Sequence, residues 1–284
     1  MTTHLYLDSG DPAHTRNLLA KQTLLAGQTT NPSLVAKHPA VQARLTAGEH
    51  FTPTEIDTFY RDVVQEIATL VSDSVSIEVY ADTETTVAAM VEEGRIMNTW
   101  IPNAHIKLPT TSAGVAAAAQ LVSEGVRVNM TLCFTQAQAA AVYSATQGAA
   151  VGQVLLSPFI GRWDDFGYDG MSSITNIQRM FAAGDGHVQI LAASLRSREH
   201  LWACYQQQVD IITAPYALLR AWADDHFPMP PSDFVYESGL PPVPYEELDL
   251  TASWESFSLE HELVTNGVAR FAADWNAMFA PASG

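Results

Sequence analysis

The chain has 284 residues, of which 47% are apolar and 16% charged, a globular composition with enough material for one large core. Its 31 acidic and 14 basic residues give a net charge of -17, and no concentrated basic patch offsets it. Such a charge repels nucleic acids and anionic membranes. The sequence has no apolar run of about 18 residues and no secretion pattern at its start. We therefore expect a cytoplasmic protein without nucleic-acid or membrane partners.

Short β-type runs alternate with helical segments along most of the chain. The runs span residues 4–10, 27–31, 74–80, 104–109, 126–132, 152–159, 187–194 and 209–215. Eight βα units favour an α/β fold of the closed parallel (β/α)8 type, the TIM barrel. A dinucleotide-binding fold is excluded because no GxGxxG motif follows the first strand.

Three regions extend this minimal barrel. Residues 33–73 are long for one crossover, so we expect a helix or helix pair there. Residues 226–262 form a Pro-rich excursion on the surface, because prolines interrupt helices and central strands. Residues 263–279 are amphipathic and predict a C-terminal helix that packs on the barrel. A second role, in covering the barrel mouth or contacting a second subunit, is a hypothesis. With no repeat or linker, 1–284 is expected to be one domain, in a monomer or homodimer.

Lys107 is the most informative of the three lysines. Lys21 and Lys37 lie in polar contexts and are interpreted as solvated surface charges. In the run AHIKLP, Ile106 and Leu108 are expected to face outward and Lys107 to face the barrel interior. A buried lysine must be paired with an acid or held neutral, because burial disfavours the charged form.

Polar side chains also end most of the other strands. Because parallel barrels build their active sites at the carboxyl ends of the strands, these residues should surround one mouth. Inward polar groups are costly in a core but suit a polar substrate. The residues are Asp8, Asn31, Glu78, Asn129, Thr131, Ser157, Ser194 and Arg196.

Several of these segments together resemble the transaldolase family. They are LYLDSGD, GQTTNPSL, VSIEVYAD, IKLPTT, VNMTLCFTQAQA, LLSPFIGRWDD and ILAASLRS, in this order from residue 5 to about 197, and LVTNGVARFAADW near the end resembles the family's last helix. The family is a (β/α)8 barrel with a Schiff-base lysine on its fourth strand, where Lys107 falls. The resemblance implies transfer of a dihydroxyacetone unit from fructose 6-phosphate or sedoheptulose 7-phosphate to glyceraldehyde 3-phosphate or erythrose 4-phosphate, in the pentose phosphate pathway.

The resemblance also implies residue roles. Lys107 forms the Schiff base, Asp8 is the general base, Glu78 shuttles protons, and Thr131 positions a water. The remaining matched positions bind the substrate; they are Asn31, Asn129, Ser157, Phe159, Arg162, Ser194 and Arg196. No cofactor and no metal is implied. Cys133 and Cys204 agree with this, because they have no metal-ligand spacing and are interpreted as reduced core thiols.

Three alternatives stay open from the sequence. A fructose 6-phosphate aldolase-like enzyme would release free dihydroxyacetone. Such enzymes resemble this chain but have glutamine in place of Glu78 and tyrosine in place of Phe159. A relative with a specialised sugar substrate and a catalytically silent barrel are the others. The chain departs from the family pattern at Thr110, where many relatives have alanine, and in the 33–73 and 226–247 regions.

Other candidate residues have plainer interpretations. His105 shares the face of Lys107 but has no second ligand at metal spacing, so it is interpreted as a hydrogen-bonded barrel residue. Adjacent acids face apart and do not form a glycosidase pair. We interpret them as solvated or helix-start charges: Glu92, Glu93, Asp164 and Asp165.

Overall fold

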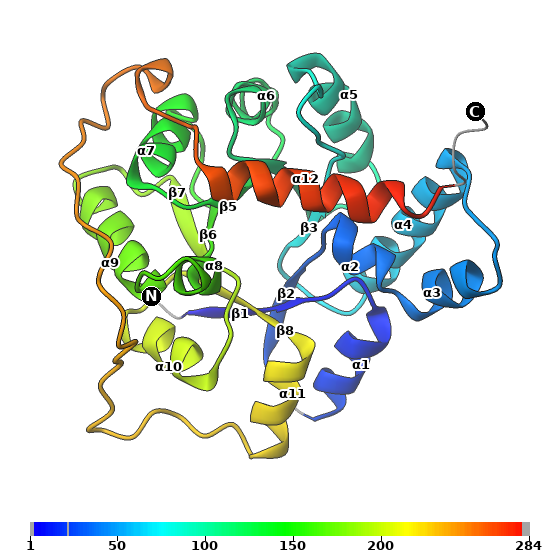
Figure 1. Cartoon of the computed structure of the whole chain (residues 1–284), viewed down its shortest axis with the longest axis horizontal. Helices are drawn as coiled ribbons and strands as arrows, with labels where there is room; N and C mark the ends of the chain where they lie inside the picture. The colour runs from blue at the N-terminus through cyan, green and yellow to red at the C-terminus, as the bar shows by residue number, and fades with distance from the viewer. Residues whose placement is uncertain (1–2, 22, 280–284) are drawn as a thin grey trace.

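The computed structural model describes residues 3–21 and 23–279, and eight parallel strands within them close into a barrel (Figure 1). Each strand pairs with the next along the chain, and the eighth pairs with the first. The (β/α)8 prediction is confirmed, with strand ends shifted by one or two residues. The strands are β1 His4–Asp8, β2 Leu25–Thr29, β3 Val75–Glu78, β4 Ala104–Pro109, β5 Val128–Cys133, β6 Val154–Pro158, β7 Val188–Ala192 and β8 Ile211–Pro215.

Helices surround the barrel, and most begin at a side chain that accepts a backbone N–H, as expected of helix N-caps. Asp11, Thr86 and Thr111 are examples, and Thr52 with Glu55 forms a complete capping box. The helices are α1 Pro12–Ala20, α2 Pro32–Ala36, α3 Pro39–Thr46, α4 Pro53–Ala68, α5 Val87–Asn98, α6 Ser112–Ser123, α7 Gln136–Ala145, α8 Ile160–Asp165, α9 Gly170–Phe181, α10 Arg198–Gln206, α11 Tyr216–Asp224 and α12 Glu262–Asn276.

The long crossover between β2 and β3 holds three helices, α2, α3 and α4, where one or two were predicted. Each begins with a proline, at Pro32, Pro39 and Pro53. Proline suits the first helical position because its missing N–H would have no partner there. The three prolines therefore mark where the three helices of this crossover begin.

Side chains of each strand alternate between the helical layer and the barrel interior. Ile106 and Leu108 are fully buried outside the barrel, and Gly94 lets α5 approach Ile106 closely. Inside, a separate apolar cluster contains Tyr6, Leu155, Leu191, Ala193 and Ile211. This cluster fills the interior beneath the polar layer and is the packed centre expected of a barrel.

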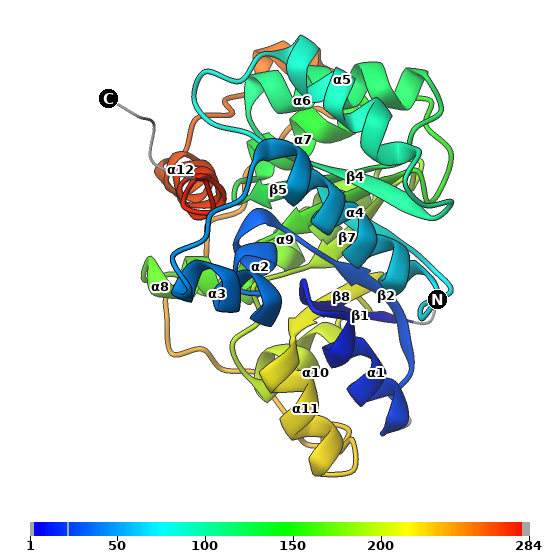
Figure 2. The same cartoon turned by 90° about the vertical axis from the view of Figure 1, so that its right-hand side faces the viewer.

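The last helix lies across the carboxyl ends of the strands. Figure 2 shows α12 at one end of the barrel, with the start of β1 at the other. Gly267 allows α12 to lie against Leu132, because an added Cβ would meet that side chain at 2.7 Å. Asn276 donates to the Tyr80 hydroxyl at 3.1 Å. The predicted C-terminal helix is confirmed, although it begins at Glu262 and ends at Asn276.

The segment from residue 226 to 261, called the strap here, leads from α11 to α12 along the outside of α10, α9 and α7 (Figure 1). Its one helical turn in the described chain is the 3-10 helix Trp254–Ser256. Neighbouring side chains bind its backbone: Gln136 exchanges two hydrogen bonds with Glu246, and Gln138 donates to the Leu259 carbonyl. The predicted excursion is thus attached to the barrel along its length. In the described residues, we find no helix with the length and apolar content that crossing a membrane requires.

Candidate active site

Lys107 and Glu78 form a buried ion pair inside the barrel. The two residues lie side by side in register on β4 and β3. The Lys107 Nζ is 3.0 Å from a Glu78 carboxylate oxygen and donates to the Thr30 carbonyl at 3.2 Å. Each side chain is only 4% exposed. The prediction that Lys107 faces inward is confirmed, and of the two states predicted for a buried lysine, paired or neutral, the structure shows the paired one.

Burial makes Glu78 a group that titrates near neutral pH. Loss of solvent raises its pKa from 4.5 to about 7, and the nearby Asp8 carboxylate adds to the rise. The Lys107 ammonium opposes both effects. A carboxyl group with a pKa near 7 can both accept and donate protons at physiological pH. This is the property that a proton shuttle needs.

Asp8 lies at the end of β1, on the same mouth. Its carboxylate accepts a hydrogen bond from the Thr29 hydroxyl at 2.7 Å. Burial raises its pKa, while the Lys107 and Lys37 charges and the Thr29 hydrogen bond lower it. Lys37 is exposed, as predicted, but it also lines the active-site cavity, so its interpretation as only a surface charge was incomplete.

Amide and hydroxyl groups of β5 and β6 lie next to the lysine. Asn129 is in register with Lys107, accepts from the Ser157 hydroxyl at 2.6 Å, and donates to the Ser76 hydroxyl at 3.0 Å. The buried Thr131 hydroxyl has no hydrogen-bond partner among the described residues. Asn31 caps α2 through its side-chain oxygen, which accepts from the Leu34 N–H at 2.9 Å. Its side-chain oxygen is therefore engaged by the start of α2.

A cavity of about 250 Å³ opens at this mouth. All the predicted site residues line it except Glu78 and Asn129, which are buried around it. The lining residues are Asp8, Thr29, Asn31, Ser33, Leu34, Lys37, Lys107, Thr131, Ser157, Phe159, Arg162, Ala193, Ser194, Leu195, Arg196, Thr213, Pro215, Arg270 and Phe271.

Arginines concentrate positive charge on one side of this cavity. Burial lowers the pKa of Arg162, and the like charges of Arg270 and Arg196 lower it further. Arg196 is half exposed and donates to the Asp165 carboxylate at 2.8 Å. Ser194, next to Arg196, has a φ of 60°, a backbone conformation that non-glycine residues rarely adopt. The local positive charge is what a phosphate would need in a chain of net charge -17.

Sequence reasoning missed Arg270 and Phe271 as site residues. Both come from α12 and line the cavity. Phe271 belongs to the apolar face from which the helix was predicted, but nothing in the sequence distinguished Arg270 from a solvated charge. The placement of α12 across the mouth agrees with one of the two hypothetical second roles of this helix, and a subunit contact stays a prediction.

Two of the adjacent acids depart from their interpretation as solvated or helix-start charges. Glu93 accepts two hydrogen bonds from the Tyr80 N–H, and burial raises its pKa to about 7. Asp164 contacts His200 at 3.0 Å and lies near the end of α8, not at its start. Glu92 is exposed and Asp165 is 61% exposed, as interpreted.

A larger cavity of about 800 Å³ lies at the amino ends of the strands. It includes His105, whose Nε2 contacts the Gly152 carbonyl oxygen at 3.0 Å, so the hydrogen-bonded barrel role predicted for this histidine is confirmed. Barrel enzymes react at the opposite end. Among the described residues, no group of three or more His, Cys, Asp and Glu side chains is arranged to hold a metal ion.

Fold and site together define a (β/α)8-barrel protein with a buried lysine–carboxyl pair beneath a cationic mouth. The family model described as "Transaldolase/Fructose-6-phosphate aldolase" matches residues 5–281. The chain belongs to this family.

Relatives named "Probable transaldolase" support the assignment. The one from Roseiflexus castenholzii is 32% identical over 273 residues, which cover 96% of this chain and 97% of the relative. The one from Dehalococcoides mccartyi is 30% identical over 275 residues, which cover 96% of this chain and 98% of the relative. The one from Maricaulis maris is 38% identical over 200 residues, which cover 69% of this chain and 78% of the relative.

Proposed function

We propose that this protein is a transaldolase that moves a dihydroxyacetone unit from fructose 6-phosphate or sedoheptulose 7-phosphate to glyceraldehyde 3-phosphate or erythrose 4-phosphate, as a step of the pentose phosphate pathway. The observation that carries the proposal is the Lys107–Glu78 pair, buried at the carboxyl ends of the strands of a barrel of this family. A buried lysine beside a carboxyl group of pKa about 7 suits reversible imine formation.

The first step is attack of the Lys107 amine on the ketone carbon of the donor. A proton passes from Lys107 to Glu78, across 3.0 Å, so that the amine becomes nucleophilic while the carboxyl group holds the proton. The carbinolamine then loses its hydroxyl group as water, and Glu78 returns the proton to that leaving group. The Thr131 hydroxyl, which lacks a protein partner among the described residues, orients the water that relays the proton.

The second step breaks the bond between C3 and C4. Asp8 removes the proton of the C4 hydroxyl, the aldehyde product leaves, and the electron pair of the broken bond enters the protonated imine to give an enamine on Lys107. Asn31, Asn129 and Ser157 hold the hydroxyl groups of this three-carbon fragment. The acceptor aldehyde then enters, and the steps run in reverse.

The phosphate group of donor and acceptor binds to Arg162, Ser194 and Arg196. Guanidinium groups hold phosphate oxygens with paired, charge-assisted hydrogen bonds. Arg196 would exchange its bond to the exposed Asp165 for the phosphate. The Phe159 ring, 5.8 Å from the Phe134 ring, is an apolar wall without a hydroxyl group to direct water to the enamine.

This last point separates the proposal from its nearest alternative, an aldolase that releases free dihydroxyacetone. Release requires protonation of the enamine, whereas transfer requires the enamine to persist until an aldehyde arrives. Glu78 and Phe159 both agree with the transaldolase version of the family pattern. A specialised sugar substrate would use the same chemistry and would change only the preferred donor or acceptor.

Borohydride trapping tests the proposal. The protein is incubated with fructose 6-phosphate, reduced and digested, and the adduct is located by mass spectrometry, with erythrose 4-phosphate added in an unreduced parallel reaction. We expect a three-carbon adduct on Lys107 and formation of sedoheptulose 7-phosphate. Lys107→Met should abolish the adduct, whereas Lys37→Met, a change at the other lysine of the cavity, should keep it.

Two results would contradict the proposal. Steady release of free dihydroxyacetone without acceptor would indicate the aldolase. Absence of the Lys107 adduct with both ketose phosphates would mean a different donor or a silent barrel.

A further inference from the structure

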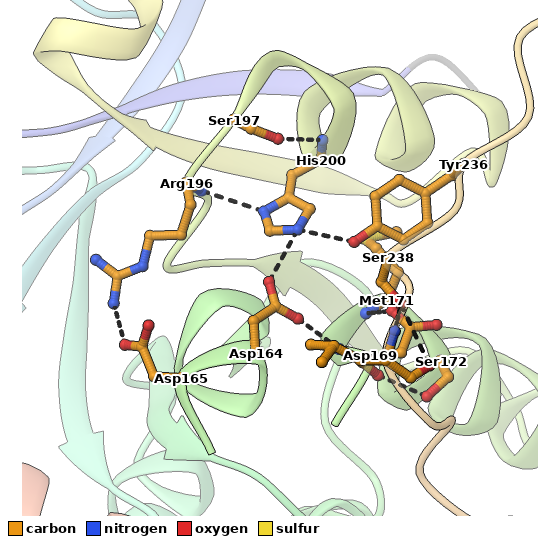
Figure 3. A network of polar contacts seen from close by, with 12 residues as sticks. Asp164, Asp165, Asp169, Met171, Ser172, Arg196, Ser197, His200, Tyr236 and Ser238 are labelled. Atoms are coloured by element: carbon orange, nitrogen blue, oxygen red, sulfur yellow. Dashed lines mark hydrogen bonds and ion pairs between the residues drawn. The ribbon is translucent and has the colours of Figure 1, made fainter. Parts of the chain in front are cut away.

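His200 lies where three segments meet near the predicted phosphate site (Figure 3). It is 5% exposed and belongs to the first turn of α10. The segments are α8, which carries Arg162, the loop after β7, which carries Arg196, and the strap, which contributes Tyr236. None of the roles assigned above uses this histidine.

The two arginine-bearing segments are attached to each other closely. The Gly161 N–H donates to the Ser194 carbonyl at 2.9 Å, and Arg196 pairs with Asp165 of α8. A Cβ at Gly161 would lie 2.4 Å from the Ser194 carbonyl oxygen and 2.5 Å from the Arg196 side chain. The position of Arg196 therefore depends on how the loop after β7 is held against α8.

The hydrogen bonds of His200 fix which ring nitrogen carries the proton. Its Nδ1 accepts from the backbone N–H of Arg196 at 3.2 Å and so must be unprotonated. The single ring proton is then on Nε2, which lies 3.0 Å from an Asp164 carboxylate oxygen and 2.9 Å from the Tyr236 hydroxyl. The partner of one ring nitrogen determines the state of the other. Asp164 thus makes Nδ1 an acceptor for Arg196.

Asp164 is itself held in place. Its second carboxylate oxygen accepts from the Gly170 N–H, at the start of α9, at 3.0 Å. The strap approaches the same point, because the Asp169 N–H donates to the Pro241 carbonyl at 2.8 Å. Burial lowers the pKa of His200 from 6.5, and the Asp164 carboxylate partly opposes this effect. The lowered pKa favours the neutral ring that this network requires.

We propose that His200 is a positioning residue for phosphate binding: Asp164 fixes its tautomer, and its Nδ1 then holds the Arg196 backbone so that Arg196 and Arg162 face one phosphate together. The inference rests on the proposed function, in which these arginines bind the phosphate. It also gives the strap a role, because the Tyr236 hydroxyl of the strap contacts the His200 ring at Nε2.

Two substitutions at His200 distinguish the roles of its two ring nitrogens. His200→Asn places an amide oxygen near the position of Nδ1 and keeps an acceptor for Arg196. His200→Gln places its amide near Nε2, keeps the contact with Asp164 and removes that acceptor. The readouts are the affinity for inorganic phosphate by calorimetry, and kcat and KM with fructose 6-phosphate and with fructose, which has no phosphate.

We expect His200→Gln to weaken phosphate binding and to raise KM for fructose 6-phosphate about tenfold, the loss of one hydrogen bond to a positioned group. The kcat, and KM for fructose, should stay within about twofold. His200→Asn should restore most of the phosphate affinity. Such a split between the two donors would not follow from a general loss of stability.

Asp164→Asn provides a second route that leaves the histidine in place. An asparagine can keep the bond to Gly170, but its NH2 group would then face Nε2 and favour the tautomer protonated on Nδ1, which repels the Arg196 N–H. We expect the same effect, about tenfold on phosphate affinity. The matched control is His187→Gln, because His187 is also buried and bonded to an aspartate, Asp185, but lies just before β7 at the other end of the barrel.

The proposal is overturned if His200→Gln and Asp164→Asn leave phosphate affinity unchanged, or if His187→Gln lowers it equally. Failure of the proposed function gives a different result: Arg162→Met and Arg196→Met would then also leave phosphate affinity unchanged. That outcome would remove the phosphate site and with it the role of His200.

Discussion

Glu78→Gln tests the buried pair through the pH dependence of stability. Glutamine keeps the size of the side chain and removes the titrating group. In the folded protein the pKa of Glu78 is raised from 4.5 to about 7, mainly by burial. At 1.36 kcal/mol per pKa unit, this shift corresponds to about 3 kcal/mol of unfolding free energy.

The sign follows from proton binding. Below about pH 4.5 the carboxyl group is protonated in both the folded and the unfolded state, and it contributes no pH dependence. Between about pH 4.5 and 7 the unfolded chain has released the proton and the folded protein has kept it. Folding then takes up a proton, so stability falls as the pH rises. The loss should be complete above about pH 7, and Glu78→Gln should abolish it.

Urea unfolding at several values from pH 4.5 to 8 measures this effect. The stability of Glu78→Gln relative to wild type should rise across the window by about 3 kcal/mol. Glu78→Gln also removes the partner of Lys107, which can lower the unfolding free energy by a constant amount. This does not affect the test, because the test depends on how the unfolding free energy changes with pH. Parallel curves for the two proteins would refute the reasoning.

Glu93→Gln is the matched control, because burial also raises the Glu93 pKa to about 7, away from the lysine. It should remove a pH dependence of the same sign but leave activity intact. Glu78→Gln should lower kcat by about 10²-fold, as expected on losing a general acid–base group. It should also remove a limb near pH 7 from the pH profile of kcat/KM, which reports on the coupled pair.

Three further predictions concern single positions. Asp8→Asn should lower kcat by about 10²-fold or more yet still give a borohydride adduct on Lys107, now with the uncleaved six-carbon donor, because Asp8 acts after imine formation; loss of every adduct would contradict this order. Phe159→Tyr should increase release of free dihydroxyacetone relative to transfer, measured by a coupled assay without acceptor, and an unchanged ratio would contradict the role of the apolar wall. Gly161→Ala should cost about 1–3 kcal/mol in urea unfolding, because its Cβ would meet the Ser194 carbonyl, and should raise KM for fructose 6-phosphate; an unchanged KM would mean that the arginine loop adapts freely.

The barrel and the central site were predictable because parallel barrels have simple geometry. Strands that follow each other in sequence lie side by side, so runs three and four place Glu78 and Lys107 on neighbouring strands. The carboxyl ends share one mouth, which brings Asp8, Asn129 and Ser157 to the same place. No long-range contact had to be guessed for these residues.

The remaining site residues depend on contacts that strand order does not define. Arg270 and Phe271 reach the cavity only because α12 turns back across the mouth. Asp164 is half-buried and pairs with His200, which belongs to the next βα unit. A charged residue in an acidic chain looks the same in sequence whether it is solvated or paired, so neither propensity nor periodicity distinguishes these cases.

The attachment of the strap was indicated by two glutamines of the neighbouring helix α7. A segment without helix or sheet ladders must find other partners for its backbone groups, and side chains of the neighbouring helices can supply them. Gln138 is fully buried and Gln136 nearly so, and both bind strap backbone. The two glutamines at the start of the segment TQAQAAAVYSA are therefore anchors and not surface positions. Because these anchors and Tyr236 hold one continuous segment, the strap connects the outer helices to the same histidine that holds Arg196.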